Sequence, residues 1–99
     1  MQAHYPFAFE REMGCTAEDL RAWLPGACGQ RTLHWREGGV EVALGKGTVS
    51  IDWQPLAPRR IALVTLPRLA VRFAARDTDA LEWHAFMRRF DLYVQRGGG

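Results

Sequence analysis

Between Gln30 and Arg76 the sequence alternates between apolar and polar residues with a period of two. This period is typical of strands that bury one face, and glycines at 38–39 and 45–47 predict tight turns between the strands. After residue 79 the period changes to 3.6, which is typical of an amphipathic helix. The chain therefore combines consecutive strands with a helix, which predicts an α+β fold.

Two further elements precede this run of strands. Residues 4–13 alternate as a strand with three aromatic residues on its buried parity, Tyr5, Phe7 and Phe9. Pro6 lacks an N–H, so the start of this strand is expected at a sheet edge or just outside the pairing. Thr16 and Asp19 resemble a capping box, which predicts a short helix ending near Pro25-Gly26.

The second half of the run is harder to divide into strands. Pro55 and Pro58 are expected to end the strand that contains Trp53. We predict two strands beyond them, about 60–65 and 68–75, although a single bent strand fits nearly as well. The second strand points three apolar residues inward and three arginines outward: Leu69, Val71 and Phe73, and Arg68, Arg72 and Arg76.

The last element is a long helix. Asp77-Thr78-Asp79 supplies an N-cap, and an apolar stripe follows at helical spacing: Trp83, Phe86, Met87, Phe90 and Val94, widened by Leu81, Ala85 and Leu92. The helix is expected to stop at Arg96. Residues 1–96 then form one domain, and 97–99 form a flexible glycine tail.

The faces of these elements predict the architecture. An antiparallel sheet of about five to six strands, in the order β-α-β-β-β-β-α, carries both helices on one face, with Trp53 and Phe73 inside and the arginines in water. In element order this two-layer arrangement resembles the helix-grip and TATA-binding-protein-like folds. The resemblance implies a fold class and no particular function.

Composition limits the function classes. The 99 residues are 47% hydrophobic and 24% charged with a formal charge of +2, which is too small for a dedicated duplex-binding protein, so nucleic acid is not an expected partner. No stretch approaches the ~18–20 apolar residues of a membrane span, so we expect no membrane partner. Lys46 is the one lysine beside twelve arginines, as in a GC-rich coding sequence. These features predict a bacterial, cytoplasmic protein.

The sequence carries no catalytic or metal signature, so no cofactor is expected and an enzyme is not favoured. Ser50, His34 and Asp52 are triad residue types, but an open sheet face supplies no oxyanion hole. Cys15, just before a helix, is a structural rather than a reactive thiol on this interpretation. Cys28, His34 and His84 do not complete a zinc motif with it.

Three candidate binding sites remain. Arg68, Arg72 and Arg76 form a stripe for a protein partner, unless Glu10 and Glu12 pair with them across strands. An apolar small-molecule pocket under the last helix would use Trp35, Trp53, Trp83 and Phe90. The tail ending in Gly99 resembles the Arg-Gly-Gly terminus of ubiquitin-like proteins and sulfur carriers, which implies conjugation or sulfur transfer. The hypothesis we favour is a non-enzymatic binding or protein-interaction domain, whose partner could also be a second copy at an edge strand.

Overall fold

The structure is a computed structural model, and it describes residues 5–96. In chain order the elements are β1 (Ala8–Met13), α1 (Ala17–Ala27), β2 (Leu33–Arg36), β3 (Gly39–Leu44), β4 (Gly47–Ile61), β5 (Val64–Arg76) and α2 (Ala80–Arg96). This order is the predicted one, and the α+β class is confirmed. The tail at 97–99, with the proposed role of Gly99, lies outside the described residues.

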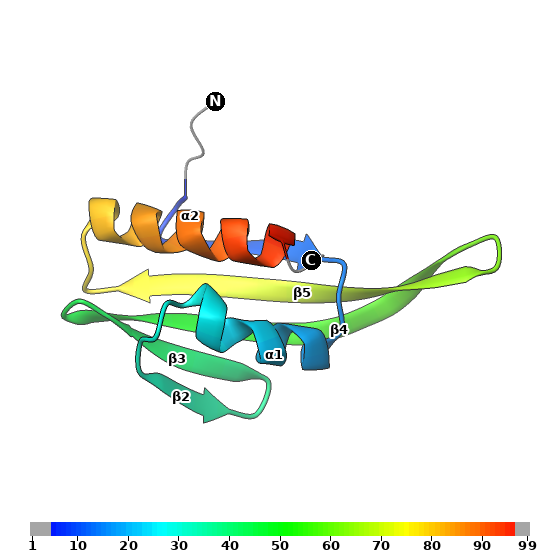
Figure 1. Cartoon of the computed structure of the whole chain (residues 1–99), viewed down its shortest axis with the longest axis horizontal. Coiled ribbons are helices and arrows are strands. Elements are labelled where there is room, and N and C mark those ends of the chain that lie inside the picture. Colours follow the sequence, from blue (N-terminus) through cyan, green and yellow to red (C-terminus); the bar gives the residue numbers. More distant parts are fainter. Residues whose placement is uncertain (1–4, 97–99) are drawn as a thin grey trace.

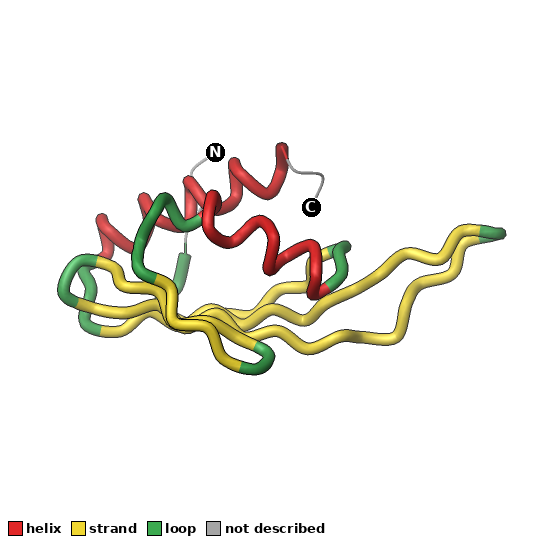
Figure 2. The backbone as a smooth tube through the Cα atoms, turned by 60° about the horizontal axis from the view of Figure 1, so that its bottom comes forward, coloured by secondary structure: helices red, strands yellow, loops and turns green. Residues whose placement is uncertain are grey.

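The five strands form one antiparallel sheet in the order β1-β5-β4-β3-β2. Three successive hairpins place β2 to β5 side by side, and β1 pairs with β5 at the other edge, which agrees with the edge position inferred from Pro6. Both helices lie on one face of the sheet (Figures 1 and 2). We call this the inner face and the opposite one the outer face.

The inner face and the two helices enclose the hydrophobic core. Trp53 and Phe73 are buried there, as predicted, and the Phe73 ring stacks on Phe9 and meets Phe90 edge-on. Trp83 from α2 is buried beside them. Since each fully buried aromatic or aliphatic side chain stabilises the fold by about 1.5–3 kcal/mol, this cluster holds α2 on the sheet.

The helix starts follow the predicted caps. The Thr16 hydroxyl accepts a hydrogen bond from the Asp19 N–H at 3.0 Å, and the Asp19 carboxylate accepts one from the Thr16 N–H at 3.2 Å. The Asp79 carboxylate caps α2 in the same way at 2.7 Å. The first helix, α1, ends at Ala27, one residue past the predicted Pro25-Gly26, and Pro25 lies inside the helix.

Several residues expected in the core lie at the surface. The first strand begins at Ala8 rather than residue 4, and Phe7, just before it, is exposed. Trp35 is exposed on the short edge strand β2, where it meets the Arg21 guanidinium. The core-facing stripe of α2 is narrower than predicted, which leaves three apolar residues at the surface: Leu81, Ala85 and Leu92.

The largest correction concerns residues 55–68. The predicted break near Pro67 is wrong, because β4 continues to Ile61, the turn lies at 62–63, and β5 runs from Val64 through Pro67 to Arg76. The predicted strand at about 68–75 lies within β5, whereas the one predicted at about 60–65 spans the turn. The prediction that Pro55 and Pro58 end the strand is also wrong. They are accommodated within β4, with a register shift between Leu56 and Arg59.

None of the helices within residues 5–96 has the length and hydropathy required to cross a membrane.

Candidate functional site

The β4–β5 hairpin extends well beyond the rest of the sheet. The β3 strand stops pairing with β4 at Asp52, and β1 stops pairing with β5 at Leu69. Beyond these points, residues 56–68 pair with one another and with no other strand of the described chain. We call residues 56–68 the arm. It accounts for the elongated shape of the molecule, 47 × 34 × 21 Å, and runs away from both helices (Figure 2).

The end of the arm is apolar and exposed. Leu63, in the two-residue turn, is fully exposed, and three neighbouring aliphatic side chains are about half exposed: Ile61 at 55%, Val64 at 53% and Leu66 at 41%. We call these four residues the apex cluster. In the turn, Ala62 has a φ of 55°, a left-handed conformation that is unfavourable for a residue with a Cβ. The apex cluster is the largest group of exposed aliphatic residues adjacent in sequence among residues 5–96.

The arm is also basic. Its residues 56–68 include three arginines, and the longer segment 53–76 contains five arginines and no aspartate or glutamate. Arg59 and Arg60 are exposed next to the apex cluster, and in the described part of the chain neither forms an ion pair. The pKa of the Glu12 carboxyl is lowered, mainly because it accepts hydrogen bonds from Arg68. The positive charge of Arg59 also contributes to this lowering.

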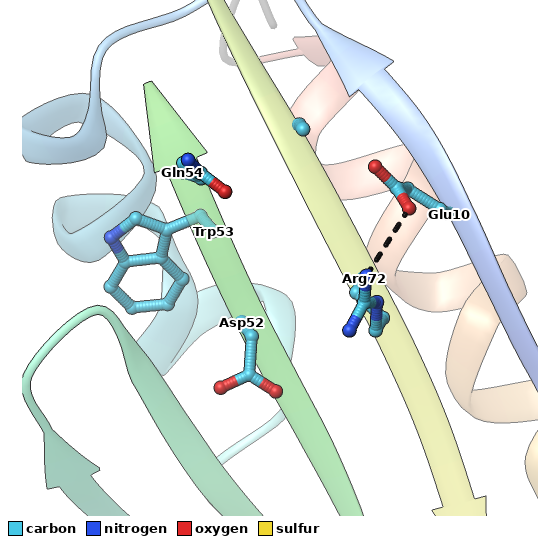
Figure 3. A pocket seen from close by; sticks show the side chains of 6 residues that line it. Glu10, Asp52, Trp53, Gln54 and Arg72 are labelled. Carbon is cyan, nitrogen blue, oxygen red and sulfur yellow. Dashed lines mark ion pairs between the residues drawn. The ribbon is translucent and has the colours of Figure 1, made fainter. Parts of the chain in front are cut away.

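The three arginines predicted as a partner site do lie together on the outer face, but each has an acidic neighbour. Arg68 donates two hydrogen bonds to the Glu12 carboxylate, at 2.8 and 3.0 Å. Arg72 lies 3.6 Å from Glu10 (Figure 3). Arg76 lies 3.7 Å from a third carboxylate, on β3. Cross-strand pairing therefore neutralises much of the stripe, which was the alternative considered from the sequence.

A second charged group covers the β2–β3–β4 part of the outer face. Arg36 bonds to both Asp52 and Glu41, and these contacts raise the pKa of its guanidinium, with Asp52 as the larger cause. The Ser50 hydroxyl donates to Glu41 at 2.6 Å and, with Arg36, lowers the pKa of the Glu41 carboxyl. Since Ser50 is committed to Glu41 and Asp52 to Arg36, these residues do not form a nucleophilic triad with His34.

Between the two charged groups the outer face has an open hollow of about 120 Å³, lined by Glu10, Asp52, Trp53, Gln54, Ala70 and Arg72 (Figure 3). The small side chain of Ala70, in register with Glu12 and Gln54, leaves this space. The hollow is shallow and polar, so it excludes little water.

The four aromatic residues predicted to line a pocket are not brought together. Trp83 and Phe90 are packed in the core between α2 and the sheet, with Trp53 buried on β4. Trp35 lies at the β2 edge beside α1. The hollow on the outer face and the groove beside Arg89, Leu92, Tyr93 and Arg96 on α2 are both away from the sheet–helix interface.

Both thiols are free and buried. Burial raises the pKa of the Cys28 thiol to about 12 and also raises that of the Cys15 thiol, so neither is set up as a thiolate nucleophile. Within residues 5–96 no cluster of His, Cys, Asp or Glu side chains has the make-up of a metal site.

Comparisons with protein-family models, curated proteins and solved structures find no match for this chain. The resemblance to helix-grip and TATA-binding-protein-like folds therefore stays a prediction, and function has to be argued from the geometry.

The arm is not among the candidate sites predicted from the sequence. One feature of the sequence does point to it: the segment from 53 to 76 has no acidic residue, although 11 of the 99 residues are acidic. The run from Ile61 to Leu66 is apolar on both parities, which is typical of a strand covered on both faces, so its sequence gives no sign of the exposure seen in the arm.

Proposed function

We propose that this chain is a non-enzymatic binding domain that presents the arm to a partner from a rigid body of sheet and helices. The exposure of the apex cluster carries the proposal. Folded proteins rarely leave large contiguous apolar patches in water, and such patches usually mark interaction sites. A two-stranded ribbon is marginally stable alone, so a projecting one gains stability from a surface that covers it.

Two observations favour binding over catalysis. The polar side chains of the outer face are engaged with one another in cross-strand ion pairs, and the hollow between them is open to water. Electrostatic catalysis needs a site that excludes water.

The free cysteines are compatible with a reducing compartment, and we propose that the domain is cytoplasmic.

Site-specific cross-linking tests the proposal. A photoreactive phenylalanine analogue at Leu63 is expected to form an adduct in the native cells, whether with a protein, a lipid or a second copy of the chain. The matched control is the same analogue at Leu81, which is also exposed but belongs to α2, at the end of the molecule opposite the arm (Figure 1). Labelling at position 63 no greater than at position 81 would contradict the proposal.

A further inference from the structure

One face of the arm is apolar at its tip. Cross-strand partners share a face of a ribbon, so the pair Ile61 and Val64 lies on the same face as Arg59 and Leu66, two positions further back. Leu63 extends this surface at the turn. Aliphatic side chains therefore lie at the end of the tip, and the Arg59 guanidinium lies behind them, closer to the body of the molecule.

Strand addition is a poor way to cover this arm. Pro55 and Pro58 in β4 and Pro67 in β5 cannot donate hydrogen bonds to an added strand. Prolines on exposed strands are a common protection against edge pairing. The contact is therefore made by the side chains of the tip.

Charge argues against a second copy as the occupant. Two arms packed on one another would bring together Arg59 and Arg60 from each chain, with no carboxylate on either arm to offset them. The groove on α2 is also a poor binding site for the arm of a second copy, because Arg89 and Arg96 line it and would repel the arginines of that arm. A surface of negative charge is required.

A nucleic acid supplies negative charge but poorly matches the apex cluster. Aliphatic side chains enter a duplex by unstacking bases, which has a large energetic cost. Strong binding also needs many cations, and the arginines on the outer face already have carboxylate neighbours. The exposed tip offers two arginines, Arg59 and Arg60.

An anionic bilayer provides phosphate and hydrocarbon at adjacent depths. We propose that the tip of the arm binds the surface of a bilayer containing anionic phospholipid, with Ile61, Leu63 and Val64 in the interfacial layer and Arg59 and Arg60 at the phosphates. From the Ile61–Val64 pair to the Arg59–Leu66 pair the ribbon spans two residue steps, about 7 Å, and interfacial segments reach ~5–10 Å deep. The inference rests on the proposed function and specifies its partner.

This partner differs from the sequence-based expectation of no membrane contact, which rested on the absence of a spanning segment. A hairpin tip at the interface needs no such segment. The arm also keeps the body clear of the lipid (Figure 1). Its β5 strand projects past β1 by five residues, and its β4 strand projects past β3 by nine, so the projection is at least ~17 Å.

Vesicle co-sedimentation tests the inference on the full chain. The chain is expected to bind phosphatidylcholine vesicles containing about one-third phosphatidylglycerol, and to bind pure phosphatidylcholine at least about tenfold more weakly. Each arginine near an anionic surface increases the affinity roughly fivefold, so the double variant Arg59→Gln/Arg60→Gln should bind about 25-fold more weakly. Leu63→Asp should lose most binding.

Two matched controls keep this test specific. Leu81→Asp adds the same charge at another exposed leucine, and Arg88→Gln/Arg96→Gln removes two exposed arginines from α2. Both are expected to bind within about twofold of the original chain, since neither touches the tip. Equal losses in the arm variants and these controls would overturn the inference, as would an absence of vesicle binding.

A fluorescent label gives an independent readout. Cys15 and Cys28 are buried, so a Leu63→Cys chain can be labelled selectively with an environment-sensitive dye. Anionic vesicles are expected to shift its emission to the blue and to leave a label at Leu81→Cys unchanged. If the cross-linker at position 63 instead captures a protein and vesicles do not bind, the bilayer inference fails while the proposed binding function stands; no adduct at all contradicts both.

Discussion

A half-buried polar group connects β1 and the residues before it to α2. It consists of Tyr5, Arg11 and Asp91. The Tyr5 hydroxyl donates to one Asp91 oxygen at 2.6 Å, and the Arg11 guanidinium donates to both, at 2.6 and 3.2 Å. Arg11 also lies over the Phe9 and Phe73 rings, with its guanidinium carbon 5.3 and 5.5 Å from their centres. This group fixes the rotation of α2 against β1 while tolerating the partial exposure of the site.

Burial, and then the hydrogen bond to Asp91, raise the pKa of Tyr5 to about 12. The unfolded chain loses this proton near pH 10, whereas the folded chain keeps it until about pH 12. Stability is therefore fully present below pH 10 and decreases as the pH rises to 12, by on the order of 1 kcal/mol after allowing for the exposure of the ring. Urea unfolding at pH 9 and pH 11 should show a smaller decrease in Tyr5→Phe than in the original chain. The decrease that remains in the variant comes from the buried Cys15 and Cys28 thiols, whose pKa values are also raised.

Absorbance titration separates the two tyrosines. The ionisation step near pH 12 should disappear in Tyr5→Phe and persist in Tyr93→Phe. A step near pH 12 that survives in Tyr5→Phe would mean that Tyr5 is not the shifted group.

At the scale of elements, two glycines lie in contrasting surroundings: Gly47 is packed closely against a neighbouring strand, and Gly14 lies in an open loop. A Cβ at Gly47, the first residue of β4, would overlap the backbone carbonyl of Arg76 and the backbone of Asp77 at the end of β5. A Cβ at Gly14, between β1 and α1, would meet open space. Backbone atoms cannot move aside as a flexible side chain can, so these two positions should respond to alanine in opposite directions.

Gly47→Ala is therefore expected to lower the free energy of unfolding by at least about 2 kcal/mol. Gly14→Ala should leave it unchanged or raise it by ~0.5 kcal/mol, because alanine restricts the unfolded chain. Denaturant melts of the two variants under the same conditions make the comparison, and equal effects would show that the approach of β4 to β5 does not constrain residue 47.

The elements themselves were largely predictable from sequence, since the periods of two and 3.6 and both helix caps identify them. The turn at 62–63 was not. Ala62 and Leu63 carry no turn signal. The prolines are the strongest breakers in the region, but they lie on a ribbon whose outer edges pair with no other strand among residues 5–96, so their missing N–H groups cost no hydrogen bond there. The pairing of Arg68 and Arg72 with β1 also needed the strand order, because β1 lies more than fifty residues away in the sequence.

At the scale of the whole molecule, the arm and the body have separate roles. The core lies between the inner face of the sheet and the two helices, and its buried residues end at Trp53 on β4 and Leu69 on β5. The arm begins beyond both, so its side chains add little to the burial that stabilises the fold. The turn at 62–63, where Ala62 has a φ of 55°, lies at the end of the arm away from both helices (Figure 2).

Replacing residues 57–67 with Asn-Gly tests this separation. The Leu56–Arg68 pair would then close a two-residue turn of the kind that asparagine and glycine favour. The free energy of unfolding in urea should change by less than about 1 kcal/mol, whereas Phe73→Ala in the core should lose about 3–5 kcal/mol. The shortened chain should keep its cooperative transition and lose vesicle binding, because the tip that meets the bilayer is gone while the core is intact. A loss of stability comparable to that of Phe73→Ala would mean instead that the arm is part of the folding unit, and its exposure would then need an explanation other than binding.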